Sequence, residues 1–188
     1  MRNHAIGVTL AIVTCLTLGG GAAAPAALTF NGADYFHRWS QKGQHEFTRQ
    51  GDEDLAKWND MVTINLHEGV RTGEDLAQLA NGVLGNYEAN GHIMRTISKP
   101  RTETGEAEHF VAAVLQVPNV LEVAFARFLL HEKRGVVAVY SKRFYGADAQ
   151  AEMTTWFKAN AVPIEKVLVS WTGIPSIDTL KKLPSTPR

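Results

Sequence analysis

Six consecutive apolar residues in the middle of the chain decide its fold: Phe110-Val111-Ala112-Ala113-Val114-Leu115. Successive side chains of a strand point to opposite faces of the sheet, so a strand with this run is apolar on both faces. Such a strand has to lie inside a sheet that is covered on both sides. We therefore predict an interior strand over Glu106–Val117 and a layer of structure on each face of its sheet.

Strand-like periodicity continues on both sides of this run, from Gly91 to about Phe144. It predicts three further strands, at His92–Ser98, Val120–His131 and Val136–Phe144. The segments between the last three strands, Pro118-Asn119 and Lys133-Arg134-Gly135, have the composition of turns. Short turns between neighbouring strands indicate an antiparallel meander.

The N-terminal part of the domain predicts a β-hairpin, with strands Tyr35–Gln41 and Gln44–Arg49 around Lys42-Gly43. Glycine at the second turn position suits the positive φ of a tight turn. A two-residue loop there pairs Trp39 with Glu46, Ser40 with His45, and Arg38 with Phe47. Beyond the hairpin, Gly51-Asp52-Glu53-Asp54 predicts a short helix that runs through Trp58, and Met61–Leu66 predicts a strand.

Two longer helices are predicted. In the first, Gly73–Tyr87, Thr72 is the expected N-cap, Asp75 completes a capping box, and one stripe is apolar. The second covers about Ala149–Asn160, where Met153, Trp156 and Phe157 share a face. Pro163 is expected to end this helix, and Ile164–Trp171 predicts a last short strand.

Together these elements predict an α+β domain over residues 27–180. Its largely antiparallel β-sheet of about six strands, with an N-terminal hairpin, is covered by two main helices and forms an α/β/α sandwich. Residues 181–188 contain two prolines and no apolar periodicity, so we predict a flexible C-terminal tail.

Residues 1–26 have the pattern of a cleavable signal peptide. Arg2 precedes an apolar run over Ile6–Leu18, and Ala24-Pro25-Ala26 offers small residues for cleavage. The run is short of the roughly 20 apolar residues that a membrane span needs, so we expect a soluble, periplasmic or secreted protein with no integral membrane segment. Cys15 offers a competing reading as a lipid-attachment site, but Thr14 suits that role poorly and simple secretion is preferred.

Composition narrows the possible chemistry. Loss of Cys15 with the signal leaves no thiol for a disulfide, a zinc site or a nucleophile. The remaining 18 basic and 19 acidic residues give a net charge of −1, which provides no reason to bind nucleic acid or anionic membranes. No serine lies in a Gly-x-Ser-x-Gly turn, and no phosphate-binding loop or His-Glu-x-x-His motif is present. His37 and His45 are expected on opposite hairpin faces, so we predict no metal and no cofactor.

The order of elements resembles the PsbP-like α/β/α sandwich. The resemblance rests on the aromatic hairpin Tyr35-Phe36-His37-Arg38-Trp39-Ser40, the capped helix at Thr72-Gly73-Glu74-Asp75, the meander from His92 to Phe144, and the closing helix with Trp156. It covers roughly the whole mature chain and supplies no catalytic motif. It implies a non-catalytic binding module, with a protein of the cell envelope as its partner.

Two groups of residues are candidates for the contact surface. The first combines Tyr35, Phe36, Arg38 and Trp39, because aromatic residues and arginine dominate the energetics of interfaces. Packing of Trp39 in the core is the competing reading of this group. The second group, at the end of the meander, contains Lys142, Arg143 and Tyr145.

An alternative function is binding of a carbohydrate or another small ligand, or hydrolysis, at Glu106, Glu108, His109 and Arg127. Glu106 and Glu108 would share one face of a strand, as an acid–base pair requires. Arg127 is the lone cation of an apolar strand and needs an acceptor, either a ligand anion or a structural partner such as Glu106 or Glu108. A third possibility is a structural envelope protein that forms homo-oligomers.

Overall fold

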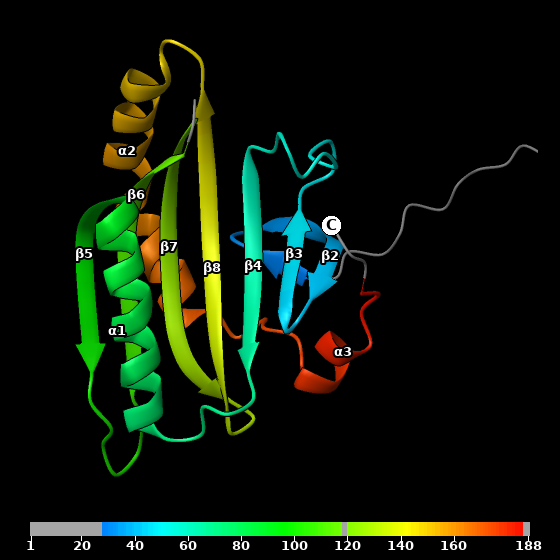
Figure 1. The fold of residues 1–188 in the computed structure, drawn as a ribbon, viewed down its shortest axis with the longest axis vertical. Coiled ribbons are helices and arrows are strands. Elements are labelled where there is room, and N and C mark those ends of the chain that lie inside the picture. The colour runs from blue at the N-terminus through cyan, green and yellow to red at the C-terminus, as the bar shows by residue number, and fades with distance from the viewer. Residues whose placement is uncertain (1–27, 118–119, 186–188) are drawn as a thin grey trace, which may run out of the picture.

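A computed structural model describes residues 28–117 and 120–185, so the predicted signal peptide at 1–26 lies outside the described residues. One antiparallel sheet of eight strands lies between two long helices on its opposite faces (Figure 1). The strand order across the sheet is β1-β2-β3-β4-β8-β7-β6-β5. The predicted α+β class with a large antiparallel sheet is confirmed, whereas the predicted number of about six strands is wrong.

The sheet has two halves that meet where β4 pairs with β8. The first half consists of β1 (Leu28–Phe30), β2 (Ala33–Gln41), β3 (Gln44–Thr48) and β4 (Asp60–His67). The second half is the predicted meander, with β5 (Gly91–Lys99), β6 (Glu108–Val117), β7 (Val120–His131) and β8 (Arg134–Tyr145). Strand β1 escaped prediction because three residues are too few to show a periodicity.

The β2–β3 hairpin turns at Lys42-Gly43 as predicted. Both residues have a positive φ, 50° and 83°, and a Cβ on Gly43 would lie 2.7 Å from the carbonyl oxygen of Leu66. The predicted pairs Trp39–Glu46 and Ser40–His45 are confirmed. The predicted Arg38–Phe47 pair is wrong, because a bulge at Arg38 places His37 opposite Phe47.

Helix α1 (Gly73–Asn90) confirms the first predicted helix. The Thr72 hydroxyl accepts a hydrogen bond from the Asp75 amide at 3.1 Å, and the Asp75 carboxylate accepts one from the Thr72 amide at 3.1 Å. This capping box satisfies amides that the first helical turn leaves without a partner. The buried face of α1, with Leu76 and Ala80, packs on one side of the second half-sheet.

Helix α2 (Ala149–Ser170) continues through Pro163, so the predicted helix end and the predicted strand at Ile164–Trp171 are both wrong. An interior proline costs a helix roughly 3 kcal/mol. Ile164 and Leu168 lie one turn apart and are 3% and 1% exposed, and burial of each contributes about 1.5–3 kcal/mol. Packing against the sheet therefore outweighs the cost of the proline.

The acidic segment after β3 does not form the predicted short helix. Residues 51–59 form turns and irregular backbone instead. One oxygen of the Asp52 carboxylate accepts from the side-chain amide of Asn59 at 2.8 Å, and the other from the Asp60 backbone amide at 3.3 Å. Asp52 thus closes the loop onto the start of β4 and does not cap a helix.

The sheet separates two apolar cores, which explains the run that decides the fold. Phe110 and Ala112 of β6 pack on the α2 side, and Val111 packs on the α1 side. The prediction of an interior strand covered on both faces is confirmed, although β6 begins at Glu108 and not at Glu106.

The chain continues beyond α2 into the short helix α3 (Ile177–Lys181), whose Leu180 is fully buried. Leu183 packs against the α2-side core, and the Ser185 hydroxyl donates to the carbonyl oxygen of Ser40 at 3.0 Å. The last part of the predicted tail, residues 186–188, lies outside the described residues. Within 28–117 and 120–185, no helix combines the length and apolar character that crossing a membrane requires.

Candidate functional site

Arg127 of β7 is held by four hydrogen bonds within the protein. Its guanidinium donates to both carboxylate oxygens of Glu108, at 2.8 and 3.2 Å. It also donates to the carbonyl oxygens of Leu168 and Trp171, at 3.1 and 2.9 Å, where α2 ends. Arg127 is therefore a paired charge next to Glu108, as its structural interpretation predicted.

Of the other two members of the predicted ligand site, Glu106 lies elsewhere, whereas His109 lines the same small space as Glu108 and Arg127. Glu106 precedes β6 and its carboxylate lies 3.7 Å from exposed Arg101. The ring of His109 contacts the Ser98 hydroxyl at 2.9 Å. The space beside Glu108 and Arg127 amounts to about 10 Å³, which is barely enough for one water molecule and far below the size of a sugar.

A second polar network joins β4 and β8 on the α2 side. The Asp60 carboxylate accepts from the Tyr140 hydroxyl at 2.5 Å and from the Lys142 ammonium at 3.4 Å. The Lys142 ammonium also lies 5.9 Å from the centre of the Trp156 ring. Burial, with the nearby Asp60 charge, raises the pKa of Tyr140 far above its usual value, so its hydroxyl remains a proton donor to Asp60.

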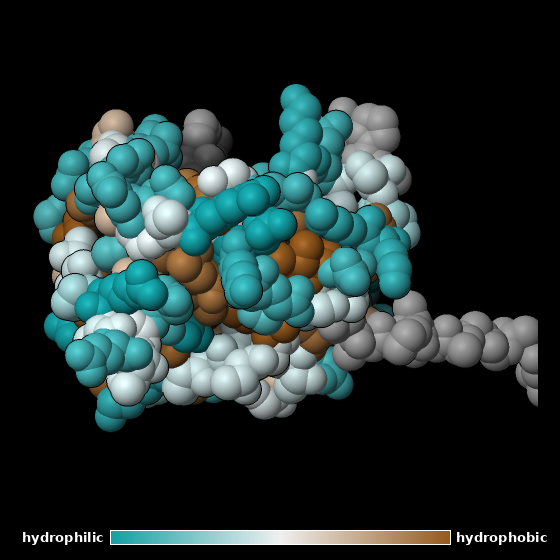
Figure 2. Space-filling view, turned by 90° about the horizontal axis from the view of Figure 1, so that it is seen from below, coloured by the Kyte–Doolittle hydropathy of each residue, from teal (hydrophilic) through white to brown (hydrophobic). Residues whose placement is uncertain are grey.

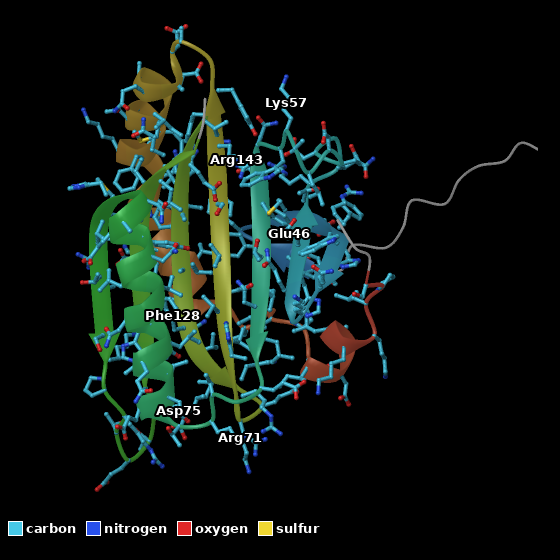
Figure 3. All side chains as sticks on the ribbon, in the orientation of Figure 1. Glu46, Lys57, Arg71, Asp75, Phe128 and Arg143 are labelled. Atoms are coloured by element: carbon cyan, nitrogen blue, oxygen red, sulfur yellow. The ribbon has the colours of Figure 1, made fainter. Side chains whose placement is uncertain are left out.

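Arg143 and Tyr145 of β8 are bound to neighbouring elements. The Arg143 guanidinium pairs with the Glu122 carboxylate at 2.8 Å and lies 4.1 Å from the centre of the Trp58 ring. The Tyr145 hydroxyl donates to the carbonyl oxygen of Trp58 at 2.6 Å. Figure 3 shows Arg143 near the upper end of the long strands, where these contacts hold the loop before β4 against β8.

The aromatic group predicted at the hairpin is mostly buried. Tyr35 is 3% exposed within the α2-side core, and Trp39 is 9% exposed. Phe36 is half-buried, with the Arg38 guanidinium 5.6 Å from its ring centre. Arg38 also donates to Thr48 and pairs with Glu53. Trp39 is thus buried, as the competing prediction of core packing stated.

The bulge at Arg38 brings His37 and His45 onto one hydroxyl, which overturns the prediction that they point to opposite faces. The Ser40 oxygen lies 2.7 Å from the Nε2 atom of His37 and 2.7 Å from the Nδ1 atom of His45. Burial lowers the pKa of both rings, and His37 adds to the effect on His45. Because Ser40 is 3% exposed, no substrate can reach this serine.

The end of the molecule at which α1 begins carries a hollow of about 680 Å³ with side chains of both charges around it. Its charged lining residues are Arg71, Arg101, Lys133 and Arg134 together with Glu106 and Glu132. Figure 2 shows this end, where hydrophilic residues surround separate apolar areas. Arg101 and Glu106 lie 3.7 Å apart, so part of this charge is already offset within the protein.

The two edges of the sheet differ. Edge strand β1 has only three residues, and the indole nitrogen of Trp171 donates to the carbonyl oxygen of Thr29 at 3.0 Å. Edge strand β5 has nine residues, of which seven are exposed and none is buried (Figure 1). Its ladder is with β6 alone among the described strands, so its outer backbone groups form an open edge.

A groove of about 450 Å³ lies beside this open edge, between β5 and the first half of α2. We call it the β5 groove. Its apolar part includes Met94, Val114, Met153 and Phe157, and its polar part includes His92 and Lys158. Met94 is 43% exposed and, among the described residues, is one of two large hydrophobic side chains in this class. The volume and the mainly apolar lining are those of a binding pocket.

The sequence did not predict the β5 groove, because each residue that lines it fits a core-packing or strand pattern when taken alone. Met153 and Phe157 belong to a helical stripe that predicts core packing. Met94 lies in a predicted strand whose position at the sheet edge is fixed only by the topology. The available signal was the order of elements, since a strand that follows a helix and begins a meander can lack a partner on one side.

Within residues 28–117 and 120–185, no three histidine, cysteine, aspartate or glutamate side chains are grouped so that they could hold a metal ion. The architecture is that of an α+β protein built on one antiparallel sheet with helices on both faces. A protein-family model matches residues 22–167, and the chain belongs to that family.

Comparison with curated proteins gives no match to the sequence. Among solved structures, the chain is similar to the Ran-binding protein Mog1p of Saccharomyces cerevisiae. The two chains are 13% identical, with a TM-score of 0.42, and the similarity covers 72% of this chain and 81% of that chain.

Proposed function

We propose that this protein is an exported, non-catalytic module that binds another protein of the cell envelope through the edge of β5. The observation that carries this proposal is the open edge of a nine-residue strand beside an apolar groove. Open edges offer a row of backbone donors and acceptors to a further strand. We include in this proposal that the fold is a PsbP-like α/β/α sandwich.

The geometry supports protein binding over the alternative, a carbohydrate site or a hydrolase. Arg127 and Glu108 satisfy each other and leave about 10 Å³ of space. Glu106 lies before the strand and is not the second member of an acid–base pair with Glu108. A ligand at this place would have to displace both Glu108 and the end of α2.

The same reasoning moves the contact surface away from the residues first suggested by the sequence. Tyr35 and Trp39 are buried, and their exposure would require opening the hairpin. Arg38, Lys142 and Arg143 are held in ion pairs with other parts of the chain. The β5 edge requires no such rearrangement.

Site-specific photo-crosslinking in the native envelope tests this proposal. A photoreactive phenylalanine derivative replaces exposed Thr96 on β5 in one variant and exposed Lys57 in a matched control. Figure 3 places Lys57 away from β5, in the loop before β4. We expect one dominant heterologous adduct from position 96 and none from position 57. Absence of any heterologous adduct from position 96 would refute a binding function for this edge.

A further inference from the structure

We propose that the β5 groove recognises an extended acidic segment that adds a strand to β5 and places one large apolar side chain in the groove. The inference rests on the proposed binding function and specifies the chemistry of the partner. Added strands gain affinity from main-chain hydrogen bonds and specificity from pockets for alternate side chains. Both parts are present here, as an open strand edge and a groove that begins at its exposed Met94.

The charges around the edge select an acidic partner. Strand β5 contains Arg95 and Lys99 and has no acidic residue. Arg95 is 59% exposed and pairs with Glu165 of α2 at 2.8 Å, while exposed Lys158 lies beside the groove and adds another positive charge. Glu165 compensates one of these three cations. An incoming segment with carboxylates would therefore gain from the net positive charge of the edge.

The positions of these cations on the strand define a pattern for the partner. Arg95 faces α2 through its pair with Glu165, and Lys99 lines the small space beside Glu108 on that same face. The bulge between Ile93 and Arg95 also leaves Met94 on this face, beside the groove. A matching segment carries its large apolar residue and its acidic residues at alternate positions, because only these share a face.

A second copy of this chain is a poorer occupant. In an antiparallel pair of β5 strands related by a two-fold axis near their middle, Arg95 would lie next to Arg95 of the other copy. Like charges opposite each other on neighbouring strands are destabilising. The bulge and the cations also guard the edge against pairing with arbitrary strands, which leaves a segment of complementary charge as the favoured partner.

The experiment measures fluorescence anisotropy of labelled ten-residue peptides with the purified domain. The first peptide has a central phenylalanine with glutamates two and four residues away on both sides. The second has the same composition, but each glutamate is shifted by one position to the opposite face. The third has lysine in place of every glutamate. We expect the first peptide to bind at least about tenfold more tightly than either control, a difference of roughly 1.4 kcal/mol.

Variants locate the binding. Met94→Glu is expected to weaken binding of the first peptide at least about tenfold. Val162→Glu is the matched control, because Val162 is the other exposed large hydrophobic residue of the described chain and lies outside the groove. Lys158→Glu is expected to reduce the difference in binding affinity between the acidic peptide and the lysine peptide. Because Met94 and Val162 are both exposed, we expect both variants to melt at the temperature of the parent protein, which would show that folding is unaffected.

The outcomes separate this inference from the proposed function. Equal binding of the acidic and shifted peptides, or binding unaffected by Met94→Glu, would overturn the inference. A heterologous adduct at position 96 without binding of any peptide would also overturn it, while the binding function would stand. A concentration-dependent dimer that is lost in Met94→Glu would assign the groove to a second copy and overturn the acidic segment.

Discussion

Replacing Arg127 and Glu108 singly and together tests whether this pair is structural. Arg127→Met keeps most of the apolar volume and removes all four hydrogen bonds. It leaves the carbonyl oxygens of Leu168 and Trp171 without this donor, and a buried polar group without a partner costs about 1–3 kcal/mol. The Trp171 oxygen is only partly buried and can take up water, so we expect a total loss of about 3 kcal/mol.

Glu108→Gln is expected to cost less. Breaking a fully buried ion pair from one side costs about 3–5 kcal/mol, but the Glu108 side chain is 28% exposed and water can partly replace it. We therefore expect a loss of about 2 kcal/mol. Once Arg127 has become methionine, the same Glu108 change should have little further effect. The double variant should lose about 3 kcal/mol, which implies a coupling of roughly 2 kcal/mol.

Urea denaturation followed by tryptophan fluorescence measures these free energies, provided that the slope of the transition is the same in all variants. Arg101→Met is the control, because Arg101 is 73% exposed and its carboxylate partner Glu106 lies 3.7 Å away. It should change stability by less than about 0.5 kcal/mol. Additive effects of the two core substitutions, or an Arg127→Met variant as stable as the parent, would refute the structural role and return Arg127 to the candidates for ligand binding.

Three further substitutions test how the fold is held. Thr72→Ala removes the N-cap of α1 and should lower the unfolding free energy by about 1 kcal/mol in the same assay, where no change would dismiss the cap. Pro163→Ala restores a helical amide and should raise it by about 1 kcal/mol or more; a loss would mean that the packed helix requires the proline. The lowered pKa values of His37 and His45 mean that the unfolded chain binds more protons below the ordinary value of 6.5. Stability should fall as the pH drops through 6.5 towards the folded pKa values, by up to about 1.4 kcal/mol per pH unit for each ring, and His45→Asn should flatten this dependence.

The parts of the fold that local patterns specify were predictable. Helix α1 has a cap, an apolar stripe and a capping-box aspartate within its own sequence. The β2–β3 turn needs glycine because of a local φ, and the pairs Ser40–His45 and Trp39–Glu46 near the turn follow from it. The bulge at Arg38 was not predictable in this way. It changes which side chains share a face, but no glycine or other residue type at this position signals a bulge. It brought His37 and His45 together on Ser40.

Contacts between residues far apart in the sequence determine the length of α2 and the open side of β5, which local patterns did not predict. Pro163 is a local signal to end a helix, but Ile164 and Leu168 find a buried surface that exists only after the sheet has formed. Similarly, nothing in the strand Gly91–Lys99 states that its outer side remains open. That fact follows from the order of eight strands, which depends on β4 pairing with β8 across a long separation in the sequence.

The course of α2 connects the closed site to the open one. Because the helix runs past Pro163, the carbonyl oxygens at its end reach Arg127 and complete the acceptors of the guanidinium. A helix that ended at Asn160 would have left Arg127 with Glu108 as its only acceptor. Arg127 would then have remained a candidate for binding the anionic group of a ligand. The first half of the same helix, with Met153 and Phe157, instead lines the groove beside β5. One helix thus supplies the acceptors that make Arg127 structural and also lines the groove that stays open at the sheet edge.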